Sequence, residues 1–192
     1  MSTTNAPITV RLRESDRASL ASHFIQLDAE DRRLRFGSNI GDESLHDYVN
    51  RIDFERDGVF AVHDDEGARL LAVIHVALSA KSAELGLSVA TEVRGQGLGS
   101  ALFLRAVTFL RNRATPEVFV HCLTENGAMM HLARKYRMRI IPAGGETDAR
   151  LALDPPTAHT VFAEWFHEYN AATVTAVRDQ ARFARTLLGY FA

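Results

Sequence analysis

The feature that most constrains this chain is a glycine-rich turn, Arg94-Gly95-Gln96-Gly97-Leu98-Gly99. An alternating segment typical of a strand, Ala83–Val89, precedes it, and an apolar segment with helical spacing, Leu98–Arg113, follows it. Three glycines within five residues allow the backbone to bend sharply and to approach a ligand closely. The helix adds unpaired N–H groups and a positive dipole end, so the sequence predicts a diphosphate-binding turn.

The spacing of the glycines separates this turn from other phosphate-binding motifs. A dinucleotide fingerprint, G-x-G-x-x-G, would need a third glycine where the chain has Ser100 or Leu102. A P-loop would need a Gly-Lys-Ser/Thr ending, which does not follow this turn. A glycine-rich turn without any ligand remains the alternative.

The patterns around the turn predict an α+β fold, in which helices flank a mostly antiparallel mixed sheet. The predicted strands are Pro7–Arg13, Val59–His63, Leu70–Leu78, Ala83–Val89, Val118–Leu123, Arg139–Ile141 and Ala149–Leu153. The predicted helices cover Ala18–Ile25, Asp42–Ile52, Leu98–Arg113 and Ala128–Arg137, and Asp42 and Glu43 mark the start of the second. The charged stretch Leu27–Gly41 predicts a loop, or a short helix within a loop, and Asp64–Gly67 predicts a hairpin turn.

The composition changes after Pro155-Pro156, so we expect a domain at residues 7–154 and a C-terminal helical extension at 155–192. The apolar residues of this extension, on one or two amphipathic helices, are Phe162, Trp165, Phe166, Tyr169, Val174, Val177, Phe183, Leu187 and Leu188. Such a stripe is typical of packing. It covers the sheet or makes a homodimer contact, and the sequence leaves both open.

Charge and composition exclude several classes of partner. The net charge of -2 gives no field that would draw the chain to nucleic acid or to an anionic membrane. No apolar run approaches the roughly 20 residues of a membrane span, and the polar segment Met1–Ala6 lacks the apolar core of a signal peptide. The single cysteine, Cys122, is expected to lie in the core. No pattern of ligands indicates a metal site. We therefore expect a cytoplasmic protein without metal, membrane or nucleic acid.

The motif Arg94-x-x-Gly97-x-Gly99 resembles the Q/R-x-x-G-x-G/A signature of the GNAT N-acetyltransferases, and the order of predicted elements fits that family over residues 8–153. A looser resemblance is to the acetyltransferase domains of bacterial Pat-type protein-lysine acetyltransferases. It is carried by Ala83–Val89, by Glu125–Met129 and by Leu132–Lys135. The fold implied by the resemblance is the GNAT fold.

The GNAT resemblance implies acetyl-CoA as co-substrate, with its pyrophosphate on the turn amides and its pantetheine arm along the preceding strand. The implied contacts are Leu87, Ser88, Val89, Arg94, Gly95, Gln96, Gly97, Leu98, Gly99, Ser100 and Asn126. Asn126 begins a predicted helix, so it is also expected to cap that helix, and both roles can hold together.

The catalytic base implied by the Pat-type resemblance is Glu84. An alkylammonium has a pKa near 10.4, so a positioned base helps it to lose a proton at neutral pH. Strand alternation places Glu84, Gly86 and Ser88 on one face. A solvated glutamate at the end of a strand is the alternative. The family's tyrosine, which protonates the leaving thiolate, is replaced by Ala133, and Tyr136, three residues later, is expected to be a packing residue.

The basic segment Asp31–Phe36 borders the acceptor site in this fold. Its arginines either bind a substrate carboxylate or form a solvated charge run, with Phe36 in the core. The function predicted is acetyl transfer from acetyl-CoA, by direct attack, to a primary amine on a protein lysine or a small molecule. A non-catalytic acyl-CoA-binding module is the alternative, and an interaction protein built on the C-terminal aromatic residues is a third.

Overall fold

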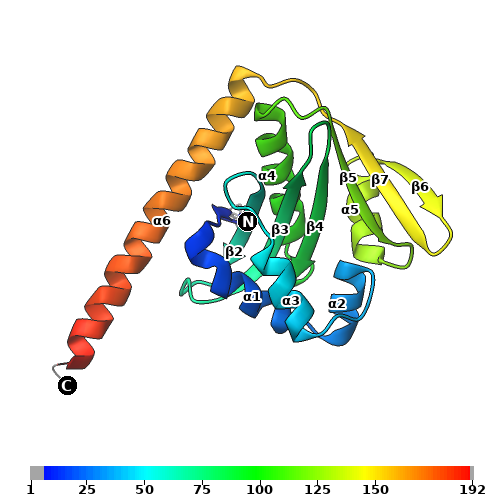
Figure 1. Ribbon diagram of the computed structural model, residues 1–192. Coiled ribbons are helices and arrows are strands. Elements are labelled where there is room, and N and C mark those ends of the chain that lie inside the picture. The colour runs from blue at the N-terminus through cyan, green and yellow to red at the C-terminus, as the bar shows by residue number, and fades with distance from the viewer. Residues whose placement is uncertain (1–6, 191–192) are drawn as a thin grey trace.

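The computed structural model describes the backbone of residues 7–190 and the side chains of residues 7–176 (Figure 1). The strands are β1 (Val10–Arg11), β2 (Gly58–His63), β3 (Leu70–Leu78), β4 (Ala83–Val89), β5 (Glu117–Leu123), β6 (Arg139–Ala143) and β7 (Glu146–Ala152). The helices are α1 (Arg17–Ile25), α2 (Ala29–Phe36), α3 (Asp42–Asn50), α4 (Leu98–Asn112), α5 (Gly127–Lys135) and α6 (Ala158–Tyr190), with 3₁₀ turns at Glu14–Asp16 and Thr91–Val93.

The described strands form one sheet in the order β1-β2-β3-β4-β5-β7-β6. The pair β4–β5 is parallel, and the other neighbouring pairs are antiparallel. The predicted α+β fold with a mostly antiparallel mixed sheet is therefore confirmed. Within the charged stretch Leu27–Gly41 the short-helix alternative is correct: Asp28 caps α2 by accepting a 2.7 Å hydrogen bond from the Asp31 amide, and Gly37 ends it at a φ of 78°.

Helices cover both faces of the sheet (Figure 1), and each face has its own apolar core. On one face, α1 and α3 bury a cluster that includes Leu20, Phe24 and Val49 against β2 and β3. On the other face, α4 and α5 pack on the sheet with a larger cluster, to which Cys122 of β5 belongs. Cys122 is 6% exposed, so the prediction of a core cysteine is confirmed.

The strands β4 and β5 pair over a very short length and then separate. The parallel register contains two pairs, Ala83 with Val118 and Glu84 with Phe119. Beyond them β4 continues on β3 as far as Val89, and β5 continues on β7 as far as Leu123. The peptide groups of β4 that face β5 after Glu84 therefore have no strand partner, although such groups require a hydrogen bond when they are buried.

The helix α6 is a single helix that runs along α4 and β1 and then extends past the domain (Figure 1). Ionic contacts join it to α4: the buried Arg105 donates to Glu164 (3.5 Å) and Glu168 (3.3 Å), and Asn112 donates to Glu164 (2.6 Å). The aromatic side chains do not cover the sheet, because they are 49–61% exposed; they are Phe162, Trp165, Phe166 and Tyr169.

Several predictions on the terminal segments lie outside the described side chains. These are the polar segment Met1–Ala6 and the apolar residues Val177, Phe183, Leu187 and Leu188. The homodimer contact and the domain boundary after residue 154 stay predictions. In the part of the chain that the structure describes, no helix is both long enough and apolar enough to cross a bilayer.

The contact between α4 and α6 predicts that Glu164→Gln destabilises the protein. Arg105 is 2% exposed, and once Glu164 is neutral its charge is left with one carboxylate partner, the half-exposed Glu168. We expect a loss of about 1.5–3 kcal/mol in the free energy of unfolding, the range for a hydrogen bond to a charged group. Urea unfolding measures it. Glu55→Gln, at an exposed glutamate in a loop, is the control, and equal losses in the two variants would contradict this account.

Candidate active site

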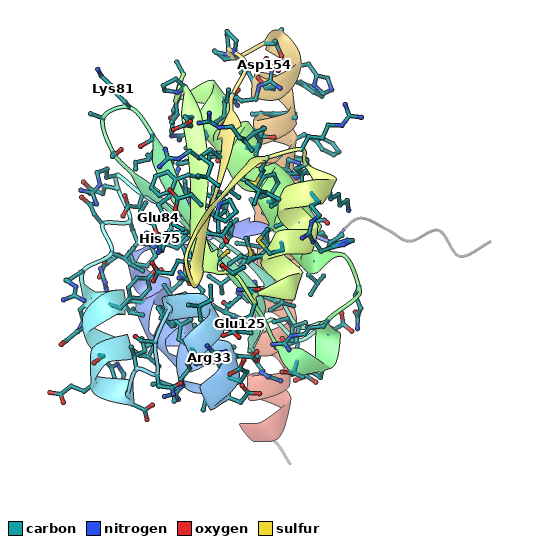
Figure 2. The ribbon with its side chains drawn as sticks, turned by 90° about the vertical axis from the view of Figure 1, so that its right-hand side faces the viewer. Arg33, His75, Lys81, Glu84, Glu125 and Asp154 are labelled. Atoms are coloured by element: carbon teal, nitrogen blue, oxygen red, sulfur yellow. The ribbon has the colours of Figure 1, made fainter. Side chains whose placement is uncertain are left out.

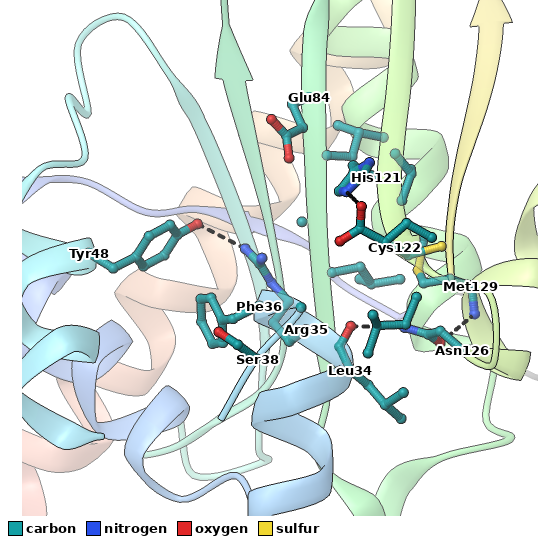
Figure 3. Close-up of a pocket in the computed structure, with 17 residues that line it drawn as sticks. Leu34, Arg35, Phe36, Ser38, Tyr48, Glu84, His121, Cys122, Asn126 and Met129 are labelled. Carbon is teal, nitrogen blue, oxygen red and sulfur yellow. Dashed lines mark hydrogen bonds and ion pairs between the residues drawn. The ribbon is translucent and has the colours of Figure 1, made fainter. Parts of the chain in front are cut away.

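A cavity of about 510 Å³ occupies the gap between β4 and β5 (Figure 3). Helix α2, the segment after it and the start of α5 close its sides. Its lining residues are Leu34, Arg35, Phe36, Gly37, Ser38, Tyr48, Glu84, Leu85, Gly86, Leu87, Val120, His121, Cys122, Leu123, Asn126, Met129 and Glu146. The parting of the two strands thus creates the space that a ligand would need.

The glycine turn joins the end of β4 to α4 through two left-handed residues. Gly95 and Gly97 have φ values of 77° and 82°, and Gly97 is the N-cap of α4. None of the six amides from Gly95 to Ser100 donates to an acceptor within the described part of the chain. Amides at a helix N-terminus without protein acceptors suit an anion, so the turn fits a diphosphate.

Gly99 allows α4 to start close to β4. A Cβ at this position would lie 3.3 Å from Leu87 Cδ2 and 3.8 Å from Val89 Cγ2. The turn, the start of α4 and the end of β4 therefore form one contiguous surface. Leu87, Val89 and the turn residues, which the sequence placed in one cofactor site, are neighbours in the structure.

The side chain of Arg94 points away from the turn amides towards α2. It forms an ion pair with Asp31, which is 8% exposed, and its Nε donates to the Val89 carbonyl (3.4 Å). Asp31 also accepts from the Thr91 hydroxyl (3.2 Å). These contacts tie the turn to α2 and leave its backbone N–H groups accessible.

Ser88 contributes only its backbone to the cofactor side. Its hydroxyl is 2.8 Å from His23 Nε2, and His23 Nδ1 is 2.8 Å from the Leu70 carbonyl. A carbonyl only accepts, so Nδ1 carries the proton and Nε2 accepts from Ser88. Burial lowers the pKa of His23 to about 4, so the ring is neutral at physiological pH.

Asn126 is buried, and both the oxygen and the nitrogen of its side-chain amide are hydrogen-bonded. Its Oδ1 accepts from the Met129 amide (3.0 Å), which confirms the predicted helix cap, and its Nδ2 donates to the Leu34 carbonyl (3.1 Å). The neighbouring Glu125 forms an ion pair with Arg33 (Figure 2). The contact of Asn126 with a cofactor stays a prediction.

Glu84 lines the cavity (Figure 3). It is exposed and occupies the last position at which β4 pairs with β5. The expected alternation holds: Gly86 contacts Arg35 of α2 and Ser88 contacts His23 of α1, on the face opposite Leu85. No described cation lies within ion-pair distance of Glu84, so its carboxylate is available to a substrate.

His121 is a candidate that sequence reasoning missed. It lies on β5, lines the cavity, and its Nδ1 is 2.8 Å from Asp148 Oδ1, while Nε2 is 3.4 Å from Glu146 Oε2. The hydrogen bond that His121 donates to Asp148, with the two carboxylate charges, raises the pKa of His121 above its usual value. Asp148 is its partner across β5–β7, so strand pairing was the missing signal.

Among the described side chains, no group of three or more potential ligands is placed to hold a metal ion.

Ala133 occupies the position at which the family resemblance implies a proton-donating tyrosine, and the nearby Tyr136 does not replace it. Ala133 is 2% exposed. The ring of Tyr136 stacks on Phe103 at 4.4 Å, and its hydroxyl donates to the Ser100 carbonyl at 3.4 Å. The prediction that Tyr136 is a packing residue is confirmed.

The three arginines of α2 differ in their surroundings. Arg32 pairs with Asp42, and Arg33 pairs with Glu30 and Glu125. Phe36 packs on the core as expected. Arg35 is half-buried against aromatic rings and lines the cavity, so the solvated interpretation is wrong for this residue. Gly86 explains the difference, since a side chain there would collide with the Arg35 guanidinium.

Comparison with known proteins identifies the family. The model of the acetyltransferase (GNAT) domain matches residues 9–139. The chain belongs to the GNAT acetyltransferase family, as the sequence motif predicted. No curated protein matches it in sequence.

Solved structures share the fold at low sequence identity. The GNAT domain of S. lividans PAT matches with a TM-score of 0.64 and 18% identity, over 76% of this chain and 89% of that domain. The ribosomal-protein-alanine N-acetyltransferase from Brucella melitensis has a TM-score of 0.58 and 16% identity, over 76% and 99%. An N-acetyltransferase from Staphylococcus aureus Mu50 has a TM-score of 0.61 and 12% identity, over 78% and 100%. These likenesses establish the architecture alone.

The buried His23 predicts a loss of stability in mild acid. Its folded-state pKa is about 4, below the unfolded value near 6.5, so between these values the unfolded chain binds more protons. The contribution of neutral His23 is complete above pH 6.5 and declines as the pH falls towards 4. For this one group we expect about 2 kcal/mol lost between pH 7 and pH 5.

Urea unfolding of wild type and His23→Gln at both pH values isolates this contribution. The variant should lose less stability between pH 7 and pH 5 than wild type does. Equal losses would show that His23 is not responsible. The variant also controls for His75, whose pKa is likewise lowered by burial, because His75 is present in both proteins.

Proposed function

We propose that this protein transfers an acetyl group from acetyl-CoA to a primary amine. The observation that carries the proposal is the gap between β4 and β5. It has free turn amides beyond the end of β4 and an available carboxylate, Glu84, on the acceptor side. A long thioester can bind along β4 while an amine approaches from the face of Glu84.

The residues proposed to hold acetyl-CoA fit its chemistry. The amides from Gly95 to Ser100 meet the diphosphate, and the unpaired peptide groups of Leu87–Val89 meet the amide groups of the pantetheine arm. The acyl group that acetyl-CoA supplies is already activated as a thioester. The protein's part is to position it, to exclude water and to remove one proton from the amine.

Glu84 is proposed as the base, acting directly or through one water. The neutral amine nitrogen then attacks the thioester carbonyl carbon and forms the C–N bond. As the C–S bond breaks, the nitrogen's second proton passes through water to the leaving thiolate. Direct attack is supported by Cys122, the cysteine of the cavity wall. Burial raises the pKa of its thiol, and a thiol rather than a thiolate is a poor nucleophile.

A non-catalytic acyl-CoA-binding module is the second candidate. Ala133 favours it, because no tyrosine hydroxyl is available there for the leaving thiolate. A thiol pKa near 8.5 makes protonation by water sufficient, so catalysis does not depend on that tyrosine.

Glu84→Gln discriminates between the two functions. We expect acetyl transfer to fall by about 10²–10⁴-fold, the usual effect of a general base, while acetyl-CoA affinity stays within a factor of two. Calorimetry with acetyl-CoA and a free-thiol assay measure these two quantities. Glu146→Gln, at the other carboxylate lining the cavity, is the matched control.

Three outcomes would contradict the proposal in different ways. Equal losses in Glu84→Gln and Glu146→Gln would remove Glu84 as the base. A loss confined to His121→Gln would transfer that role to His121. Tight acetyl-CoA binding by wild type, without transfer to a broad panel of amines, would favour the binding module.

The glycine turn predicts that Gly97→Ala weakens acetyl-CoA binding. A Cβ at a φ of 82° costs about 1–2 kcal/mol, so the turn relaxes and its amides lose their orientation. We expect the dissociation constant to rise at least tenfold. The matched control is Gly144→Ala, in the β6–β7 hairpin, with a φ of 67° and open space around it. It should cost similar stability without altering binding, and equal affinities in the two variants would overturn the diphosphate site.

A further inference from the structure

A chain of hydrogen bonds runs from the cavity wall into the interior. Arg35 Nη2 donates to the Tyr48 hydroxyl (2.8 Å; Figure 3). The same hydroxyl is 2.7 Å from His75 Nδ1. His75 Nε2 lies 3.2 Å from Asp57 Oδ2. Figure 2 shows His75 close to Glu84, on the adjacent strand. The proposed proton transfer from the amine uses none of these four residues.

The protons of this chain can be assigned. Burial opposes ionisation of Asp57, but hydrogen bonds from Arg56, the Leu78 amide and His75 outweigh it and lower its pKa. Burial, reinforced by the charge of Arg35, lowers the pKa of His75, so the ring is neutral. Its single N–H is on Nε2 and faces Asp57, so Nδ1 accepts from Tyr48. Tyr48 therefore accepts from Arg35, and the network fixes the guanidinium.

Packing holds the Arg35 guanidinium in the same place. Its central carbon lies 4.7 Å from the ring centre of Phe36, 5.6 Å from that of Tyr48 and 5.8 Å from that of Phe24. Gly86 provides the space on the opposite side. A glycine inside a strand often marks such a close approach. The site is therefore built around a positioned arginine.

The Arg35 guanidinium lacks an anionic partner among the described side chains. Arg94 and Arg105 have carboxylate partners, but Arg35 has none within 4.0 Å among the described side chains. Its Nε is buried without a hydrogen-bond partner. A partly desolvated charge without a counter-ion is unfavourable, and a guanidinium fork matches a carboxylate in shape. Of the residues lining the cavity, Arg35 is the only lysine or arginine.

The cavity also carries negative charge, at a distance from Arg35. Glu84 of β4 and Glu146 of β7 line it, whereas Arg35 projects from α2. An ammonium group is attracted to the two carboxylates, and a carboxylate is attracted to Arg35. We propose that the acceptor is a free amino acid or a close analogue, whose carboxylate binds Arg35 while its amine faces Glu84. This proposal rests on the acetyltransferase function.

The test compares amines that differ by one carboxylate. The pairs are phenylalanine with phenethylamine, ornithine with 1,4-diaminobutane, and lysine with 1,5-diaminopentane. We expect wild type to prefer the carboxylate member of at least one pair by about 10- to 100-fold in kcat/KM, the worth of one charge-assisted hydrogen bond. Arg35→Met should abolish this preference, mainly through KM, and leave kcat/KM for the plain amine unchanged.

Two further variants and one binding measurement keep the test independent of folding defects. Tyr48→Phe retains the ring and removes the hydroxyl that positions Arg35, so the preference should fall severalfold while KM for the plain amine is unchanged. Arg51→Met, at an exposed arginine after α3, is the matched control. 3-Phenylpropionate, which has a carboxylate and no amine, should raise the melting temperature of wild type and not that of Arg35→Met.

The outcomes separate this inference from the proposed function. Equal kcat/KM for both members of every pair would overturn the inference and leave the acetyltransferase intact. A preference for Nα-acetyl-lysine amide over lysine would overturn it in favour of a protein lysine. A uniform fall in kcat for all amines in Arg35→Met would show that Arg35 acts on the thioester instead. No transfer to any amine would overturn both proposals.

Discussion

The site depends on the early end of the hydrogen bonding between β4 and β5. Two parallel pairs join them, after which β4 stays with β3 and β5 stays with β7. The peptide groups left between the two strands face a cavity, and buried peptide groups need partners. An extended ligand rich in amides, such as a pantetheine arm, satisfies them. The same separation places Glu84, at the last paired position, in the wall of the cavity.

Helix α2 connects the two sides of this gap. Asp31 binds Arg94 and Thr91 on the β4 side, while Arg33 binds Glu125 and the Leu34 carbonyl accepts from Asn126 on the β5 side. The same helix carries Arg35 into the cavity. The glycine turn, the cavity and the two strands are thus linked through one short helix, whose N-cap and C-terminal glycine fix its length.

On the proposed function, electrostatics give the cavity its selectivity. The carboxylates of Glu84 and Glu146 attract an amine, and the network from Asp57 through His75 to Tyr48 holds a cation opposite them. Neutral His75 is essential to this arrangement, since a charged ring would donate to Tyr48 and compete with Arg35. On the proposed mechanism, the free turn amides bind the diphosphate of the co-substrate. The ammonium and the carboxylate of the acceptor likewise each meet a group of opposite charge.

The sequence by itself determined the family and the positions of its elements. The glycine spacing at Gly95, Gly97 and Gly99 is local, because positive φ angles and close approach are properties of single residues. Strand alternation likewise placed Glu84, Gly86 and Ser88 on one face correctly. Only the tertiary structure decided the pairing of His121 with Asp148, the inward path of Arg35 and the ionic attachment of α6 through Arg105. His121 and Asp148 are 27 positions apart in the sequence, and Arg105 and Glu164 are 59 positions apart. The path of Arg35 depends on the unfilled space beside Gly86. The periodicity of the sequence records neither kind of relation.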